Sequence, residues 1–458
     1  NGGVNIPLGD YFAMRLSALY QSRDDWIDNE YEPGPEDEIG GYTTGAGRFQ
    51  LLWAPADNFD MLLNLHAWDV DGTARVFRAN ILTPGGGGLV GDFEQDKVWH
   101  DGKNEQQISS YGGSLRFDWD WGFATLTSIT AFEKIDKMYS RGDIDGGFGA
   151  VFAPPSGPGF IPFPSESADG IPNLDQFTQE LRLASNGNAT VDWLVGAFYF
   201  NEDFQADTYS FNTLAPGNPR DGYAFQTQEA TSYALFGSLN FHLGDKWDVV
   251  AGLRYTDDEK DFSAERPDPT FQLPTFQPIT ENTDADNVSW DLSATYKASA
   301  NVNYYGRVAT GFRAPSIQGR ILFCADFEGG LNPATNCVTV ADSEEINSFE
   351  IGAKTILAEN KLRLNVAAYM FEVDGQQITA VGGEFNTATL LNADKTEGYG
   401  LEADIEWTPT GNWLMTFGAS YNPTEIKDPN LTEAPCGAVC TVTDPDIDGL
   451  ASIDGNSH

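Results

Sequence analysis

An acidic stretch near the end of the sequence has the spacing of a calcium-binding loop. Asp444, Asp446 and Asp448 alternate with other residues and are followed by Gly449, an arrangement in which carboxylates converge on one hard cation. Gly455 stands where an EF-hand carries its closing Glu, and the surrounding pattern predicts no flanking helices. A merely acidic loop is therefore the favoured interpretation, and bound calcium is the alternative.

The four cysteines form two close pairs in loop-like sequence. Cys324 and Cys337 make one pair, and Cys436 and Cys440 make the other. An even number of cysteines in close pairs predicts two local disulfides and an oxidising compartment. Zinc binding is the less favoured alternative, because the histidines lie apart from both pairs: His66, His100, His242 and His458.

No group of residues predicts catalysis. The histidines are isolated, and no Ser or Cys stands in a recognisable nucleophile motif, so we expect no enzyme activity and no resident cofactor. The 68 acidic residues outnumber the 26 basic ones and give a net charge of -42, which argues against nucleic acid as a partner. Cations, neutral ligands and basic partner surfaces remain compatible with this charge, although a solvated acidic surface explains it most simply.

Residues 396–421 show the pattern that the rest of the chain repeats. Apolar Tyr399, Leu401 and Ala403 alternate with Gly400, Glu402 and other polar or small residues, which predicts a strand between an apolar medium and a wet one. A tight turn at 409–412 leads into a second alternating arm. Each arm has about ten residues, the length that a tilted strand needs to cross a bilayer.

The same unit recurs from Tyr11 onward and predicts about fifteen strands, with short turns on one side and long loops on the other. The strand at 123–132 is poorly patterned and is predicted from its neighbours only. No run approaches the ~18 apolar residues of a spanning helix. We therefore expect an all-β, transmembrane, antiparallel up-and-down β-barrel, rather than a β-helix, a propeller or a soluble sandwich.

Aromatic residues independently support a membrane boundary. They cluster beside the short turns, where amphipathic rings favour the interface between lipid and water. A soluble sandwich has no reason to carry such a ring at one end. The residues are Trp53, Phe59, Trp119, Trp121, Phe123, Trp193, Phe241, Trp247, Tyr296, Tyr304, Trp407 and Trp413.

A set of charged residues occupies the strand positions that alternate with the apolar ones. An Arg or Lys on the lipid face costs ~2–4 kcal/mol near mid-membrane, so these residues should face a wet or protein-filled interior. They either hold a plug by ion pairs and hydrogen bonds, which we favour, or line a solvated channel. The set is Arg15, Arg48, Arg116, Glu180, Arg182, Arg254, Arg307, Glu350, Lys354, Arg363, Glu402, Asp404 and Glu406.

Two loop features are candidates for ligand binding. Arg313 begins a long loop near the predicted outer mouth; an anionic ligand is one role for it, and pairing within the protein is the favoured one. Phe152, Phe160 and Phe163 lie in a Pro- and Gly-rich loop. These rings either grip a hydrophobic ligand or pack against one another.

Four pieces of the sequence resemble the barrel part of TonB-dependent outer-membrane receptors of the iron-complex type. They are GGVNIPLGDYFAMRLSALYQ, TQELRLAS followed by DWLVGAFYF, GRVATGFRAPSIQGR and EGYGLEADIEWTPTGNWLMTFGASY. The resemblance covers nearly the whole chain. It implies a barrel of about twenty-two strands with an N-terminal plug, in which the periplasmic protein TonB pulls on a short box before the plug to admit substrate.

The resemblance also sets expectations for domains and partners. We expect residues 1–458 to form one partial barrel domain, with the plug and TonB box before Asn1 and further strands after His458. The expected partners are TonB, a ferric siderophore or similar metal chelate, outer-membrane lipid and lipopolysaccharide. A passive porin or structural barrel is the alternative function, and a soluble β-rich binding protein is a third.

Overall fold

The structure is a computed structural model built almost entirely from antiparallel strands, as expected for the all-β class. Among the described residues, no helix has the length and apolar character to span a membrane. The described residues are 1–78, 81, 88–91, 93–147, 165–187, 190–213, 215–269, 275, 278–322, 324, 337–382, 387–433, 446–447 and 450–457.

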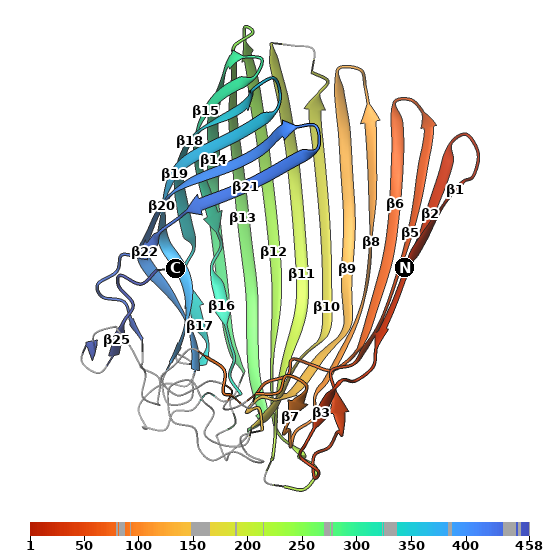
Figure 1. The fold of residues 1–458 in the computed structure, drawn as a ribbon, viewed down its shortest axis with the longest axis vertical. Coiled ribbons are helices and arrows are strands. Elements are labelled where there is room, and N and C mark those ends of the chain that lie inside the picture. The colour runs from red at the N-terminus through yellow and green to blue at the C-terminus, as the bar shows by residue number, and fades with distance from the viewer. Residues whose placement is uncertain are drawn as a thin grey trace.

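One sheet of seventeen strands dominates the structure (Figure 1). Its strands are β1 Gly2–Pro7, β2 Phe12–Arg23, β5 Tyr42–Ala56, β6 Phe59–Gly72, β8 Glu105–Asp120, β9 Ala124–Asp143, β10 Glu166–Ser185, β11 Val191–Phe211, β12 Arg220–Leu243, β13 Trp247–Asp268, β14 Ile279–Ser299, β15 Val302–Arg313, β18 Glu344–Leu357, β19 Leu362–Gly382, β20 Thr387–Thr410, β21 Trp413–Tyr421 and β22 Thr424–Ile426.

Strands that follow one another in this sheet pair antiparallel, except that β21 and β22 both pair with β20. The sheet curls into a trough, and short turns join the strands at one end (Figure 1). The sequence placed the first strand at Tyr11 and missed β1. In β1, Val4 and Ile6 alternate with Gly3 and Asn5 over only six positions, so the periodic signal is short; β1 is placed by its pairing with β2.

Large apolar side chains cover one face of the sheet and are exposed, as the alternation predicted. Leu235, Tyr255 and Val288 lie opposite one another on β12, β13 and β14, and they are 64%, 42% and 52% exposed. Contiguous exposed apolar surface of this extent is typical of a face covered by lipid. We call this the outer face and the opposite one the inner face.

The predicted aromatic ring lies along the turn end of the sheet. Phe12 stacks on Trp53, Trp53 contacts Phe59, and Phe59 contacts Trp119, with ring centroids 5.7–6.4 Å apart. The series continues to Trp121 and Phe123, and Trp247 and Tyr296 form a similar contact at 4.8 Å. These rings place the membrane boundary at the short turns.

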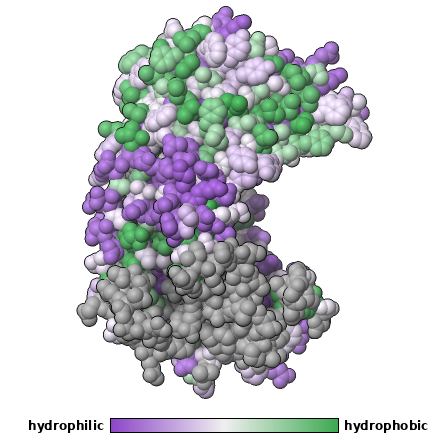
Figure 2. Space-filling view, turned by 90° about the vertical axis from the view of Figure 1, so that its left-hand side faces the viewer, coloured by the Kyte–Doolittle hydropathy of each residue, from purple (hydrophilic) through white to green (hydrophobic). Residues whose placement is uncertain are grey.

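Many strands are about twice as long as the ten residues expected. For example, β12 has 24 residues and β13 has 22. At ~3.3 Å per residue such strands reach well past the ~30 Å hydrocarbon layer even when tilted. Figure 2 shows apolar residues gathered toward the turn end and a hydrophilic band beyond them. Each long strand therefore has a spanning half near the turns and an outer half that stands in water.

Smaller sheets lie at the outer halves of the long strands. They are β3 Ile27–Asn29 with β4 Glu38–Ile39 and β7 Lys97–Val98; β16 Ser316–Gln318 with β17 Thr339–Ala341; and β23 Thr432–Glu433 with β24 Asp446–Ile447 and β25 Leu450–Ser452. Clusters of buried apolar residues lie here: Ile27, Ile39 and Val98 form one, and a larger one surrounds Phe262 and Ile321.

Candidate functional site

The inner face of the sheet carries all thirteen predicted interior residues. Strand register places Arg363 opposite Glu406 and Arg307 opposite Glu350, on the side away from the apolar rows. Arg15 on β2 and Arg48 on β5 share this face with Ser17, which lies directly opposite Arg48. The alternation of the sequence is sufficient to place these side chains, because neighbouring positions of a strand point to opposite faces.

Four of these arginines form ion pairs within the wall. Arg116 binds Asp118 at 2.7 Å and Arg182 binds Glu180 at 2.8 Å, in each case two residues away on one strand. The other two join neighbouring strands: Arg307 binds Asp291 at 2.5 Å and Arg363 binds Glu406 at 3.1 Å. Asp118 and Asp291 were not predicted as partners, although both occupy inward-facing positions in the alternation of their strands.

Three other inner-face arginines have no carboxylate within ion-pairing distance among the described residues. Arg15 donates a hydrogen bond to Ser17 at 3.4 Å. Arg254 donates to Thr256 at 3.0 Å and lies over two phenyl rings, with its guanidinium carbon 5.7 Å from the Phe198 centroid and 5.5 Å from the Phe236 centroid. Arg48 is the third. These guanidiniums retain hydrogen-bond donors for a group inside the barrel.

Aromatic side chains on the inner face lie across glycines of the neighbouring strand. Tyr305 on β15 faces Gly352 on β18, and a Cβ added to Gly352 would lie 2.5 Å from the Tyr305 ring. The Tyr305 hydroxyl donates a hydrogen bond to Glu350, and Lys354 lies over the ring at 5.5 Å. Glycine is needed at position 352 because the Tyr305 ring approaches it closely, so Tyr305 is a structural part of the wall.

The loop candidates have different outcomes. Arg313 lies opposite Glu344 in the β15–β18 pair and approaches it to 3.8 Å, an arrangement in keeping with the structural role. The aromatic candidates Phe152, Phe160 and Phe163 lie outside the described residues, as do Asp444, Asp448, Cys436 and Cys440. The side chain of Asp446 is likewise outside the description, so the calcium hypothesis stays a prediction.

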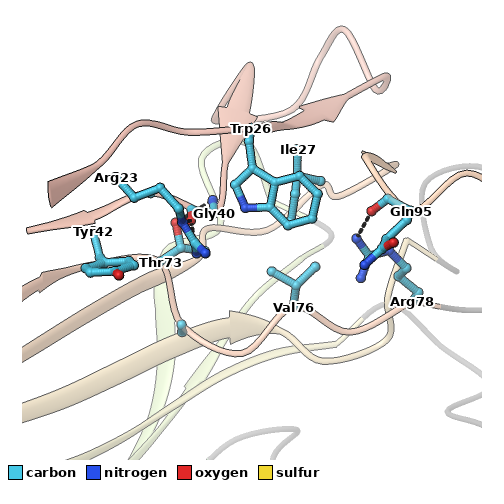
Figure 3. Close-up of a pocket in the computed structure, with 11 residues that line it drawn as sticks. Arg23, Trp26, Ile27, Gly40, Tyr42, Thr73, Val76, Arg78 and Gln95 are labelled. Atoms are coloured by element: carbon cyan, nitrogen blue, oxygen red, sulfur yellow. Dashed lines mark hydrogen bonds between the residues drawn. The ribbon is translucent and has the colours of Figure 1, made fainter.

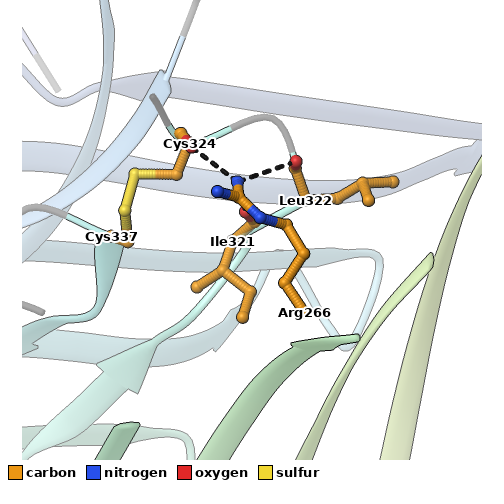
Figure 4. Close-up of a disulfide and its surroundings, with 5 residues drawn as sticks. All are labelled: Arg266, Ile321, Leu322, Cys324 and Cys337. Atoms are coloured by element: carbon orange, nitrogen blue, oxygen red, sulfur yellow. Dashed lines mark hydrogen bonds between the residues drawn. A yellow bond between two sulfur atoms is a disulfide. The ribbon is translucent and has the colours of Figure 1, made fainter. Parts of the chain in front are cut away.

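A disulfide joins Cys324 to Cys337, with their Cα atoms 5.6 Å apart (Figure 4). Beside it, the Arg266 side chain of β13 is fully buried. Its Nη1 donates to the carbonyl oxygens of Ile321, Leu322 and Cys324 at 2.8, 3.1 and 2.6 Å. Burial lowers the pKa of Arg266 to about 10. The guanidinium thus anchors this segment on the outer half of the sheet.

Three aspartates that the sequence analysis did not single out meet on the outer half. Carboxylate oxygens of Asp101, Asp143 and Asp145 lie within 4.8 Å of one another. Asp143 is fully buried and accepts hydrogen bonds from the backbone N–H groups of Asp101, Gly102 and Gly146 at 3.0–3.1 Å. Burial first, and Asp145 second, raise the pKa of Asp143 to about 8. Both Asp143 oxygens are used by backbone donors, so this carboxyl group organises its loop.

Comparison with known proteins gives a consistent result. A family model described as "TonB dependent receptor-like, beta-barrel" matches residues 49–450. The pesticin receptor of Yersinia pestis is 26% identical over 256 residues, which are 56% of this chain and 34% of that receptor.

Two solved structures are similar in fold. The ferric yersiniabactin uptake receptor FyuA from Yersinia pestis has a TM-score of 0.70 at 18% identity, over 93% of this chain and 58% of that one. The siderophore receptor PiuA from Acinetobacter baumannii has a TM-score of 0.67 at 17% identity, over 99% and 64%. The chain therefore spans less than two thirds of the length of each relative.

Proposed function

The chain belongs to the TonB-dependent receptor β-barrel family of the bacterial outer membrane, and on that premise we propose that it forms the wall of a transporter for a scarce ligand. The ligand we propose is a ferric siderophore or a similar metal chelate, admitted by energy that TonB delivers through a plug domain. Lipid and lipopolysaccharide are the proposed neighbours of the outer face. No catalytic activity and no resident cofactor are part of the proposal.

The inner face carries this proposal. The four wall-paired arginines are already neutralised by neighbouring carboxylates, whereas Arg15, Arg48 and Arg254 have no ion-pairing carboxylate in the part of the chain that the structure describes. In a chain with 68 acidic residues, arginines left without a carboxylate suit a partner that enters the interior. A plug with acidic or carbonyl groups fits this role better than bulk water does, because a passive channel gains nothing from leaving these donors open.

Uptake measurements in cells that carry the complete gene test the transport role. We expect cells with the gene to accumulate a radiolabelled ferric siderophore and to grow under iron limitation, and cells lacking either the receptor or TonB to lose both properties. Equal uptake with and without TonB would favour the passive porin. Normal growth of the receptor deletion under iron limitation, together with unchanged uptake of every chelate supplied, would contradict the proposal.

Charge reversal tests plug docking separately. We expect Arg48→Glu and Arg254→Glu in the full-length receptor to raise its conductance in planar bilayers, because the plug is held less tightly. Arg307→Gln is the matched control, since Arg307 is paired with Asp291 within the wall and should leave the conductance low. A low conductance in all three variants would contradict docking through the unpaired arginines.

A further inference from the structure

A cavity of about 440 Å³ lies in the outer face of the sheet, across β10, β11, β12 and β13. Strand register places its lining in two rows. In the row nearer the short turns, Ala197 lies between Leu181 and Leu235, which are 44% and 64% exposed. In the next row Tyr199 is directly opposite Tyr233, with ring centroids 5.0 Å apart. Because Ala197 is shorter than the side chains around it, it forms the floor of a groove.

The groove lies at the outer boundary of the spanning half. Tyr255 lines it and is directly opposite Leu235. The next outer-face residue of β13 is Asp257, opposite Tyr233, where the outer face becomes acidic. The short turns lie at the other end of the strands, which is the periplasmic end in bacterial barrels. The groove therefore opens toward the exterior leaflet, with its tyrosines at the level of the headgroups.

A second cavity, at the outer end of β2, has a different character (Figure 3). Arg23 lines it and donates through Nε and Nη2 to the carbonyl oxygen of Gly40 at 3.0 and 2.5 Å. Arg78 lines it as well and donates to the carbonyl oxygen of Gln95 at 2.7 Å. These hydrogen bonds fasten neighbouring segments to one another, so this cavity is a joint within the outer half and lies apart from the lipid-covered face.

The groove on the outer face is suited to a hydrocarbon chain. Gln179, a polar side chain of the tyrosine row, is satisfied by β9, because its Nε2 donates to Ser128 at 3.0 Å and its Oε1 accepts from Thr130. The leucine and tyrosine side chains offer packing contacts without demanding hydrogen bonds. Lipid chains are as apolar as leucine, so the groove gains packing rather than burial. The choice between lipids must therefore come from the headgroup.

Neutral hydrogen-bonding groups occupy the outer-face positions beyond the two tyrosines. Asn201 is directly opposite Thr231, and its Nδ2 donates to the Thr231 hydroxyl at 3.2 Å. Carboxylates flank this pair on β13, where Glu259 is opposite Thr231 and Asp257 is two residues away. In a chain with a net charge of -42, these carboxylates repel a phosphate. The hydroxyl groups of a sugar can instead donate to them.

We propose that this groove binds one acyl chain of a saccharide-headed lipid of the exterior leaflet. The chain lies over Ala197, between Leu181 and Leu235, and the sugar hydroxyls bind Asn201, Thr231 and the flanking carboxylates. The proposal rests on the proposed function only in taking lipid as the neighbour of the outer face, and it adds the class of lipid and its place. Binding of this lipid requires neither TonB nor a transported ligand, so the two proposals can fail separately.

Native mass spectrometry of the full-length receptor in lauryldimethylamine oxide, a detergent without sugar, tests the site. The probes are a monoglucosyl diacylglycerol and phosphatidylglycerol with the same chains. We expect one glucosyl lipid to bind about tenfold more tightly than phosphatidylglycerol, the effect of roughly one or two added hydrogen bonds. Ala197→Leu should weaken the glucosyl lipid by about tenfold, because roughly ten close atom contacts are lost. Thr231→Val should weaken it by about threefold and leave phosphatidylglycerol unchanged.

Ala251→Leu is the matched control. Ala251 is also an outer-face alanine between two leucines, Leu239 and Leu292, but it does not line the groove. Both alanine variants add an apolar side chain to a lipid-covered position, so we expect both to fold, which thermal unfolding checks. Ala251→Leu should bind both lipids like the wild type. Equal binding of the two lipids by the wild type, or equal losses in Ala197→Leu and Ala251→Leu, would overturn the proposal.

Discussion

The spanning and outer halves of the same strands bury opposite faces. On β13, Leu253 lies in the spanning half on the outer face and is 58% exposed, whereas Phe262 lies in the outer half on the inner face and is 5% exposed. Beyond Tyr255 the outer-face positions of β13 become acidic: Asp257, Glu259 and Asp261. The difference shows that the surrounding medium decides which face is apolar, since lipid covers the spanning half of the strand and water surrounds its outer half.

The largest effect should come from removing the buried cation of the outer half. Arg266→Ala leaves the carbonyls that Arg266 serves, among them those of Ile321 and Leu322, without their donor. At ~1–3 kcal/mol for each buried unsatisfied group, we expect a local loss of at least about 3 kcal/mol. Hydrogen exchange should accelerate at 316–322 and 337–341 and stay slow in the spanning half. Arg266→Lys keeps the charge and should be milder; unchanged exchange in Arg266→Ala would show that the outer core does not depend on the guanidinium.

A charge placed on each face of the spanning half should separate lipid from interior. Leu235→Arg puts a cation on the outer face of β12, and we expect it to lower the folding free energy in lipid vesicles by ~2–4 kcal/mol. Ser238→Arg, on the inner face of the same strand, should cost less than ~1 kcal/mol because that side is wet. Denaturant titration in vesicles measures both. Equal costs for the two variants would mean that the outer face is not covered by lipid.

A smaller effect is expected where an inner-face ring lies on a glycine. In Gly352→Val the new side chain displaces the Tyr305 ring, and overpacking of this kind costs ~1–3 kcal/mol. Gly306→Ala on the neighbouring strand is the control, because its Cβ would meet the nearest atoms at an ordinary 3.8 Å. The same vesicle titration compares them. If Gly306→Ala is as destabilising as Gly352→Val, the ring contact is not the cause.

Acidification should loosen the outer half while leaving the spanning half intact. His100 is buried, its Nε2–H donates to the Phe77 carbonyl and its Nδ1 accepts from Asn104, so it is held neutral. Burial lowers the pKa of His100 below its usual 6.5, which means that its stabilising contribution is complete above pH 6.5 and is lost as the pH falls below that value. Exchange at 97–104 should therefore accelerate more below pH 6.5 in the wild type than in His100→Gln, a comparison that cancels the opposite contribution of Asp143, whose pKa is raised. The same pH profile in both proteins would assign the pH dependence to other groups.

The smallest effect concerns like charges on the outer face above the membrane. Asp257 lies opposite Asp286, and Glu259 lies opposite Asp284, and like charges directly opposite one another destabilise a sheet by ~0.2–1 kcal/mol. Asp257→Asn should therefore stabilise the receptor slightly at low salt and have no effect at high salt. Asp245→Asn, in the turn at the other end of β13, should leave stability unchanged at low and at high salt. A stabilisation that survives high salt would not be electrostatic.

The sequence predicted the spanning half well, since lipid on one side and a polar interior on the other impose strict alternation on neighbours such as Leu253 and Arg254. It did not predict that strands such as β13 continue beyond Asp257, because charged and small residues alternating in water resemble a loop. The meeting of Asp101, Asp143 and Asp145 was also not predicted. These aspartates are brought together by loops that follow no periodic pattern.

The outer face of β13 changes from apolar to acidic between Tyr255 and Asp257, and this change marks the height at which the strand leaves the lipid. From Asp257 to its end at Asp268, β13 continues for a rise of roughly 30 Å once the strand tilt is included. The outer halves of the strands thereby hold the mouth of the barrel above the lipid headgroups. Solutes therefore first contact the protein in the surrounding water, at a distance from the bilayer that is set by the length of the strands.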